Sequence, residues 1–239
     1  MEYKSEGICR FCLKTFAGSA MTRHLNTCKV KKKKDEQEAA KAKQKYPIYH
    51  IRISAGKYYW LHIEMKATSK LSTLDNFFRD IWLECCGHLS GFTINGVEYQ
   101  DDFEQNDMNM FFGEQESKAM STKLSQALSV GGKFNYEYDF GSTTHLEGKV
   151  LGLREGILKE PVKILVRNNP YVIKCEECGK NATDFCCECE ISFCEECLSE
   201  HECGEDMALP IVNSPRMGVC GYCGESDSDN FYEEYNKNQ

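Results

Sequence analysis

Alternation of apolar and polar residues predicts a β-hairpin early in the chain. Two alternating segments, Ile48–Ile53 and Tyr58–Met65, are joined by Ser54–Lys57, a connection of hairpin length. Successive side chains of a strand point to opposite faces, so the apolar residues of each segment gather on one face. These residues are Tyr49, Ile51 and Ile53 in the first segment and Tyr59, Leu61, Ile63 and Met65 in the second.

The apolar spacing then changes from two residues to three and four, which predicts an amphipathic helix. Ser72 can cap its first turn, with Asp75 three positions later. The apolar face of this helix would consist of Leu74, Phe77, Phe78, Ile81 and Trp82.

Further strands are predicted after the helix. Phe92–Tyr99 contains Asn95 and Gly96, a pair that tolerates positive φ and suits a type I′ turn between two short strands. A polar loop follows, and the remaining alternating segments are Phe134–Phe140, His145–Leu153 and Val162–Arg167. One helix and about seven strands predict an α+β fold, in which the helix packs on one face of a mainly antiparallel sheet.

Composition divides the chain into five predicted segments. They are a Cys/His-containing start at 1–28, a Lys-rich linker at 29–45, the α+β domain at 46–170, a Cys-rich module at 171–224 and an acidic disordered tail at 225–239. The linker contains Lys31–Lys34 and has high helix propensity without an apolar stripe. We interpret it as a solvated helix or a flexible tether, with phosphate contact as the alternative.

Charge is distributed unevenly between these segments. Residues 1–45 carry 12 Lys and Arg against 5 acidic residues, a net charge of +7, whereas the remainder carries 17 against 32, a net charge of −15. From residue 175 to residue 239 there are 16 acidic residues and only 3 basic ones. Any nucleic-acid affinity is therefore expected in residues 1–45, because the C-terminal segment would repel a phosphate backbone.

The 15 cysteines are expected to bind metal rather than to form disulfides. Lys, Glu or Gly interrupts every long apolar stretch, and the first residues lack the apolar segment of a signal peptide. These features predict a cytoplasmic protein without a membrane span. Cytosolic thiols are kept reduced, and clustered Cys-x-x-Cys pairs there usually hold metal.

Four residues near the N-terminus have the spacing of a small zinc finger, namely Cys9, Cys12, His24 and Cys28. The last two are four apart and therefore share one face of a helix. Phe16 and Met21 would supply a miniature core that is too small to fold alone. Metal binding and folding are therefore expected to be coupled in this segment.

The C-terminal cysteines alternate in pairs, which predicts two cross-braced zinc sites. The first site would use Cys175, Cys178, Cys194 and Cys197, and the second would use Cys186, Cys189, His201 and Cys203. Four protein ligands leave no open position for water, so both sites are interpreted as structural. The spacing between the last two ligands is very short, so Cys220 or Cys223 is an alternative to His201 or Cys203.

Two other groups of residues have weaker interpretations. Cys85 and Cys86 precede Gly87 at the predicted end of the helix, where packing or helix termination is favoured over thiol chemistry or extra metal binding. A hydrolytic metal site could in principle be assembled from five other residues, although their spacing gives no support: His50, His62, His88, His145 and Asp139.

Several segments resemble known families. The N-terminal ligands resemble a Cys₂-His-Cys variant of the zinc-finger family, and residues 175–203 resemble a B-box module. The core resembles the plasmid pRiA open-reading-frame-three-like family, which includes transposon passenger and TnpR-like proteins. The segments that carry this last resemblance are Trp60-Leu61, Leu71–Leu74, Ile81–Ile94 and Tyr136–Gly141 with His145, together with Asn213–Cys220 in the tail.

The pRiA resemblance implies an α+β domain, an association with plasmids and transposons, and a loose resolvase-like label. Ser142-Thr143-Thr144 replaces the Asp and Trp more usual after the Phe-Gly step, so no function of those two residues transfers. A recombinase needs clustered arginines to stabilise phosphoryl transfer. The core arginines are scattered instead: Arg52, Arg79, Arg154 and Arg167.

The sequence therefore predicts a non-enzymatic zinc-binding adaptor or regulatory protein, linked to mobile elements and holding three Zn²⁺. We expect a protein partner, and we expect any nucleic acid to be contacted through residues 1–45. An uncharacterised resolvase-like enzyme that processes nucleic acid is the alternative.

Overall fold

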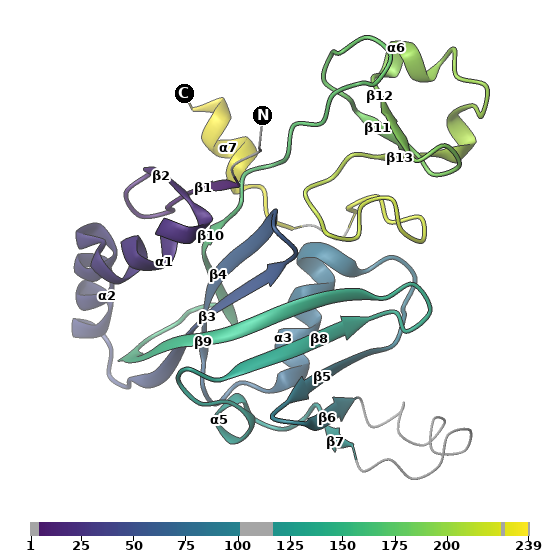
Figure 1. Ribbon diagram of the computed structural model, residues 1–239. Coiled ribbons are helices and arrows are strands. Elements are labelled where there is room, and N and C mark those ends of the chain that lie inside the picture. Colours follow the sequence, from purple (N-terminus) through teal and green to yellow (C-terminus); the bar gives the residue numbers. More distant parts are fainter. Residues whose placement is uncertain (1–4, 101–116, 226–227, 239) are drawn as a thin grey trace. The chain divides into compact units, whose positions relative to one another are not determined.

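The computed structural model describes residues 5–100, 117–225 and 228–238. The chain forms two compact units (Figure 1). Unit 1 comprises Met1–Phe77 and Leu89–Asn169, and unit 2 comprises Phe78–His88 and Pro170–Gln239. The described parts of the predicted finger (1–28) and linker (29–45) belong to unit 1 and contact its sheet through Met21, Leu25 and Lys31.

Unit 1 is built around an eight-stranded sheet with the order β10-β4-β3-β9-β8-β5-β6-β7 (Figure 1). Seven of its strands correspond to the predicted ones: β3 (Tyr46–Ala55), β4 (Tyr59–Lys66), β5 (Ser90–Ile94), β6 (Val97–Gln100), β8 (Lys133–Tyr138), β9 (Thr144–Gly156) and β10 (Val162–Arg167). All neighbouring strands are antiparallel except β6 and the short β7 (Lys118–Ala119). The predicted α+β class and mainly antiparallel sheet are confirmed.

The predicted turns have the expected backbone. Asn95 and Gly96 have φ of 52° and 77°, and Ile94 pairs with Val97 across the turn. The first hairpin closes between Ala55 and Tyr59. Residues 101–116 of the predicted polar loop lie outside the described residues, and the remainder of that loop contains β7 and α5 (Leu124–Ala127).

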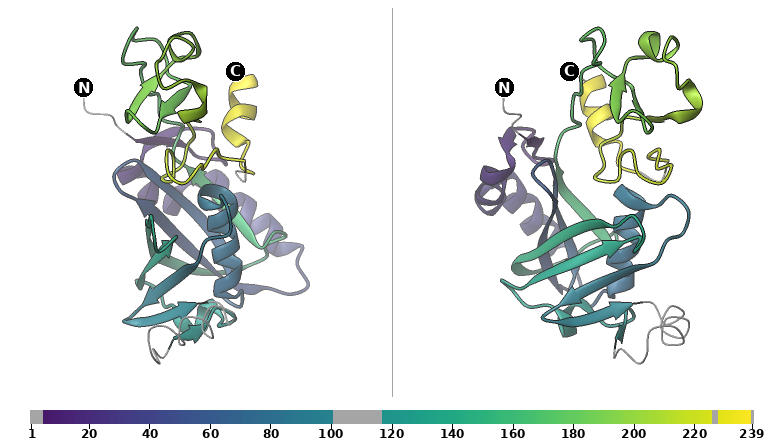
Figure 2. Two further views of the ribbon diagram at one scale, coloured as in Figure 1. Left: turned by 90° about the vertical axis from the view of Figure 1, so that its right-hand side faces the viewer. Right: turned by 45° about the vertical axis from the view of Figure 1, so that its right-hand side comes forward.

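Helix α3 (Leu71–Phe78) lies along one face of the sheet (Figures 1 and 2), and the π-helix η1 (Arg79–Leu83) continues it. The carboxylate of Asp75 fixes α3 to the sheet, because it accepts hydrogen bonds of 2.7 Å from both Ser90 Oγ and Tyr136 Oη. The predicted cap at Ser72 is wrong. The helix starts one residue earlier, and the N–H of Ser72 donates to the Met120 carbonyl.

The N-terminal segments cover the opposite face of strand β4. They form β1 (Glu6–Ile8), β2 (Thr15–Ala17), α1 (Gly18–Thr27) and α2 (Lys29–Ala40). Met21 and Leu25 share one apolar cluster with Trp60 of β4 and with Leu165 and Val166 of β10. The miniature core expected from Phe16 and Met21 is therefore completed by the sheet, and the finger is part of unit 1.

Helix α2 is anchored by ionic contacts rather than tethered loosely. Lys31 Nζ lies 2.7 Å from the Glu64 carboxylate and 2.6 Å from Asp35, and Arg154 forms a two-point ion pair with Glu64. Lys31 and Glu64 are only 7% and 1% exposed. Of the two interpretations given for residues 29–45, the structure shows the helix over Lys29–Ala40, and one of its lysines is docked rather than solvated.

Unit 2 contains a three-stranded antiparallel sheet in the order β12-β11-β13. Its elements are β11 (Asp184–Cys186), β12 (Ile191–Phe193), α6 (Glu195–Leu198), the 3₁₀ helix η2 (Glu205–Met207), β13 (Ala208–Pro210) and α7 (Phe231–Lys237). Helix α7 lies in the stretch predicted to be a disordered tail, of which residues 226–227 and 239 lie outside the described part of the chain. None of the described helices is long and apolar enough to cross a membrane.

Candidate metal centres

Four groups of Cys and His side chains converge in the described part of the chain. Within each group the ligand atoms all lie within 4.8 Å of one another. The groups are Cys9, Cys12, His24 and Cys28 (site A); Cys175, Cys178, Cys194 and Cys197 (site B); Cys186, Cys189, His201 and Cys203 (site C); and Cys85, Cys86, His88 and Cys220 (cluster D). Site A belongs to unit 1, and the other three groups belong to unit 2.

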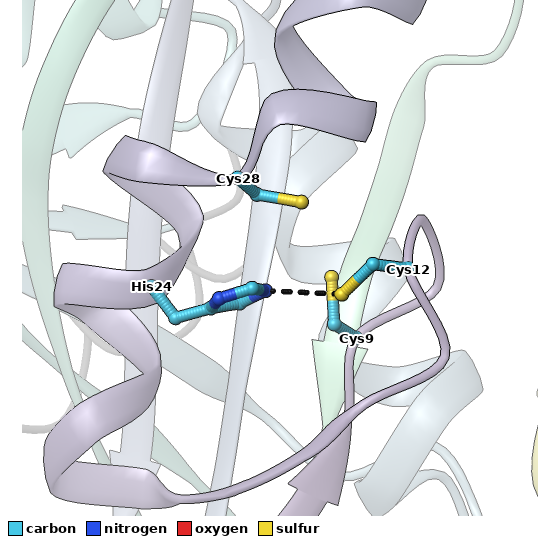
Figure 3. Close-up of side chains that lie close together, drawn as sticks. All are labelled: Cys9, Cys12, His24 and Cys28. Atoms are coloured by element: carbon cyan, nitrogen blue, oxygen red, sulfur yellow. Dashed lines mark hydrogen bonds between the residues drawn. The ribbon is translucent and has the colours of Figure 1, made fainter.

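Site A is assembled by a tight turn and a helix. The turn between β1 and β2 carries Cys9 and Cys12, and it closes through the N–H of Leu13, which donates to the Cys9 carbonyl at 2.8 Å. His24 projects from α1 and Cys28 ends that helix, so all four side chains point toward one centre (Figure 3).

The imidazole of site A is oriented by its neighbours. The His24 ring stacks on Phe16 with a centroid distance of 3.9 Å, and its Nε2 lies 3.4 Å from Cys12 Sγ (Figure 3). Burial, with a smaller contribution from Lys14, lowers the pKa of His24. A neutral imidazole is the form that binds metal, so this environment suits a ligand.

The thiols of site A lie in an apolar environment. Cys9 and Cys28 are buried, and burial raises the pKa of Cys9 to about 11. A buried thiolate is unfavourable without a cation, whereas a bound metal ion deprotonates a coordinating thiol. The four donors therefore fit a cation better than they fit an apolar core.

Sites B and C interleave along the chain, as the paired spacing predicted. Each first pair sits on a turn closed by a backbone hydrogen bond, from Gly179 N–H to the Cys175 carbonyl in site B and from Glu190 N–H to the Cys186 carbonyl in site C. The first and third Cys pairs come together in site B, and the second pair meets His201 and Cys203 in site C.

Distances in sites B and C match a shared central ion. For sulfur ligands about 2.3 Å from Zn²⁺, tetrahedral geometry places two sulfurs about 3.8 Å apart. Cys178 Sγ and Cys194 Sγ are separated by 3.6 Å, and Cys189 Sγ lies 3.4 Å from Cys203 Sγ and 3.5 Å from His201 Nε2. Both predicted ligand sets are thus close to the size required.

The alternative ligands considered for site C lie elsewhere. Cys220 groups with cluster D, whereas Cys223 belongs to none of the four groups found among the described residues. His201 and Cys203 are therefore the side chains that converge with Cys186 and Cys189 in site C. Sequence spacing missed cluster D because Cys220 lies 132 positions after His88. Cys85, Cys86 and His88 were nevertheless an unusual local concentration of donors.

The histidines considered for a hydrolytic site do not assemble with Asp139. His50 Nε2 lies 3.0 Å from His62 Nδ1 on neighbouring strands, and His145 pairs with Glu137 at 3.2 Å. Asp139 instead accepts hydrogen bonds from the N–H groups of Gly141 and Ser142 after β8.

The polar groups beneath α2 have pKa values suited to a structural role. Burial opposes ionisation of Glu64, but hydrogen bonds and charges from Arg154 and Lys31 outweigh it and lower its pKa to about 2. Burial lowers the pKa of His50 to about 4. At neutral pH Glu64 is therefore ionised and His50 is neutral, whereas a general acid or base works best with a pKa near the operating pH.

Comparisons with known proteins assign no function. No family model matches the chain, and no curated protein matches it. A crystal structure of a protein of unknown function from Methanosarcina mazei Go1 is similar, with a TM-score of 0.42 and 15% identity over 56% of this chain and 75% of that one. The resemblance of the core to the pRiA family stays a prediction.

Proposed function

We propose that this chain is a zinc-binding adaptor or regulatory protein in which Zn²⁺ ions at sites A, B and C stabilise the fold. The observation that carries this proposal is the convergence of four protein ligands at each site. Four ligands complete a tetrahedral shell and leave no position for a reacting water. The ions would therefore hold segments together rather than catalyse hydrolysis.

The donor chemistry favours zinc over other divalent ions. Sites A and C each offer three sulfurs and one imidazole, and site B offers four sulfurs. Thiolates select zinc over calcium, magnesium and manganese, which prefer oxygen ligands. Three Zn²⁺ per chain is the lower limit that this proposal requires, and a metal-free protein after gentle purification would refute it.

An adaptor role is further supported by the ion pairs of two core arginines and the burial of a third. Arg154 pairs with Glu64 and Asp35, Arg79 pairs with Glu84, and Arg167 is only 8% exposed. A resolvase-like enzyme would need arginines that converge around a phosphate. These contacts favour the adaptor over the enzyme.

We further propose that α1 and α2 contact nucleic-acid phosphates. Five basic side chains are exposed on these two helices, namely Arg23, Lys29, Lys32, Lys33 and Lys34. Lysines that neutralise phosphates release counterions, which makes binding steeply salt-dependent. The acidic unit 2 would contact a protein partner instead, because its charge repels nucleic acid.

A substitution of three lysines tests the phosphate contact. The variant Lys32→Gln/Lys33→Gln/Lys34→Gln keeps the buried Lys31 and should bind duplex DNA or RNA more weakly, with the slope of log K against log salt reduced by up to about 3. The matched control is Lys118→Gln/Lys123→Gln/Lys133→Gln, which removes three exposed lysines of the sheet region. Equal affinity and equal salt slope for the two variants would refute the contact without affecting the zinc proposal.

A further inference from the structure

We propose that cluster D is a fourth zinc site, which clamps the segment after α3 to the C-terminal segment of unit 2. Its ligands are Cys85 Sγ, Cys86 Sγ, His88 Nε2 and Cys220 Sγ. Sites A, B and C each draw their ligands from a stretch of fewer than 25 residues, whereas cluster D joins residues 132 positions apart. This ion would be a tertiary cross-link rather than the core of a local module.

The sulfur separations in cluster D have the size of a tetrahedral zinc shell. Cys85 Sγ and Cys86 Sγ are 3.8 Å apart, and Cys86 Sγ and Cys220 Sγ are 3.9 Å apart. The expected separation is about 3.8 Å for two sulfurs bound to one Zn²⁺. The remaining pair, Cys85 Sγ and Cys220 Sγ, lies within 4.8 Å, so all three thiols can reach one ion.

The imidazole of His88 supplies the fourth donor of the cluster. His88 Nε2 lies 3.0 Å from Cys86 Sγ and 3.1 Å from Cys220 Sγ. A zinc shell places sulfur and nitrogen ligands about 3.5 Å apart, so the ring would move outward by about 0.5 Å to admit the ion. This is a small displacement for a half-exposed side chain.

Backbone conformation at both ends of the cluster directs the ligands inward. Gly87 has φ of 78° and donates its N–H to the Glu84 carboxylate at 2.6 Å, which turns the chain sharply between Cys86 and His88. Cys220 itself has φ of 51°, between two glycines of positive φ at 218 and 221. A non-glycine residue in this region costs free energy, which is expected where a function requires the conformation.

The two segments are also fixed beside cluster D by buried contacts within unit 2. Ser214 Oγ donates a 2.6 Å hydrogen bond to the Trp82 carbonyl and accepts one from the N–H of Arg216. Arg216 and Tyr222 are 0% and 1% exposed. These contacts hold Cys220 opposite Cys85 and Cys86 before any ion binds, which lowers the entropic cost of metal binding.

Exposure of the ligands gives a test on the unaltered protein. Cys86, Cys220 and Cys187 are all exposed, but only the first two belong to a cluster. With zinc bound, alkylation of Cys86 and Cys220 by iodoacetamide should be at least about 100-fold slower than that of Cys187, because a coordinated thiolate is a poor nucleophile. Addition of a strong chelator should abolish the difference. Peptide mass mapping gives the rate for each cysteine.

Metal counting on variants provides the second measurement. Native mass spectrometry should find four Zn²⁺ in the wild type and three in Cys86→Ser or Cys220→Ser, with the cysteines of sites A, B and C still protected from alkylation. Cys187→Ser and Cys223→Ser are matched controls from the same unit and should retain four. Four ions in Cys220→Ser and three in Cys223→Ser would show that the wrong cysteine has been assigned.

The outcomes separate this inference from the proposed function. Three Zn²⁺ in the wild type, with Cys86 and Cys220 alkylated as fast as Cys187, would refute the fourth site and leave sites A, B and C intact. A chain lighter by two hydrogen atoms, with Cys86 joined to Cys220, would refute it in favour of a disulfide. Fewer than three ions would contradict the proposed function itself.

Discussion

Lys31 differs from the three lysines that follow it in its surroundings within the fold. Lys32, Lys33 and Lys34 are exposed, whereas Lys31 is buried against Glu64 and Asp35. Burial of a charge is costly unless it is paired, so the ion pair with Glu64 is what permits this helix face to dock. A local pattern of four identical residues could not indicate which one would be buried.

Glu64 is expected to be a major determinant of stability in unit 1. Glu64→Gln removes the negative charge between Lys31 and Arg154, and loss of one partner of a buried pair costs about 3 kcal/mol. The free energy of unfolding, measured with urea at pH 7, should fall by about that amount. The control is Glu137→Gln, whose half-exposed carboxylate pairs with His145 on the surface and should cost less than about 1 kcal/mol.

The difference in stability between the wild type and Glu64→Gln should depend on pH. The pKa of Glu64 is about 2 in the folded protein and about 4.3 in an unfolded chain. A depressed carboxylate pKa stabilises the fold above the unfolded value, and the contribution disappears as pH falls through the folded value. The stability advantage of the wild type over Glu64→Gln should therefore be constant above about pH 4.3 and shrink below it. A difference that does not change with pH would contradict the ionic explanation.

At the scale of elements, the β8–β9 pair depends on a glycine. Gly148 of β9 faces Phe134 of β8, and a Cβ at Gly148 would overlap the Phe134 ring. Phe134 is 2% exposed, so the ring has little room to move. The aromatic ring covers the glycine as a side chain would, which stabilises a strand position that is otherwise unfavourable.

Gly148→Ala should destabilise unit 1 by about 1–3 kcal/mol through overpacking. Gly152→Ala on the same strand is a matched control, because a Cβ there meets nothing within 4 Å. Thermal unfolding of the two variants provides the comparison. Similar melting temperatures for both would show that Phe134 adapts without cost.

Local patterns predicted most elements of this fold. Alternation identified the strands, and Asn95-Gly96 identified the tightest turn, because both features depend only on neighbouring residues. The start of α3 was misplaced because the N–H groups of its first residues bond to the 120–122 segment, a tertiary contact that no local signal reports. The spacing of the cysteines and histidines likewise predicted which side chains converge at sites A, B and C, because each of these groups is local in the sequence.

At the scale of the molecule, sequence patterns could not predict contacts between residues that are far apart in the chain. Cluster D requires His88 to meet Cys220, and site A requires its apolar support from Trp60 and Leu165. Neither contact produces a periodic pattern of residues in the sequence. The miniature core expected from Phe16 and Met21 was therefore incomplete, because the sheet supplies its remaining apolar contacts.

Loss of site A should consequently weaken the sheet as well as the finger. In Cys28→Ser, hydrogen exchange of the amides in β4 and β10 should accelerate at least about tenfold, because the shared apolar cluster loses its cover. Cys197→Ser, which alters site B in unit 2, is the control and should leave exchange in these two strands unchanged. Unchanged protection in Cys28→Ser would indicate that the finger folds apart from the sheet.

The packing of Met21 and Leu25 against Leu165 and Val166 also sets the order of events during synthesis. A segment made at the beginning of translation acquires its full apolar support only after residue 166 has left the ribosome. Such distant contacts form slowly, since a long loop must close first. Until then the nascent finger lacks the part of its apolar cover that Leu165 and Val166 supply. If site A holds Zn²⁺ as proposed, the ion would stabilise the finger during this interval, and zinc supply during translation would affect the yield of folded protein.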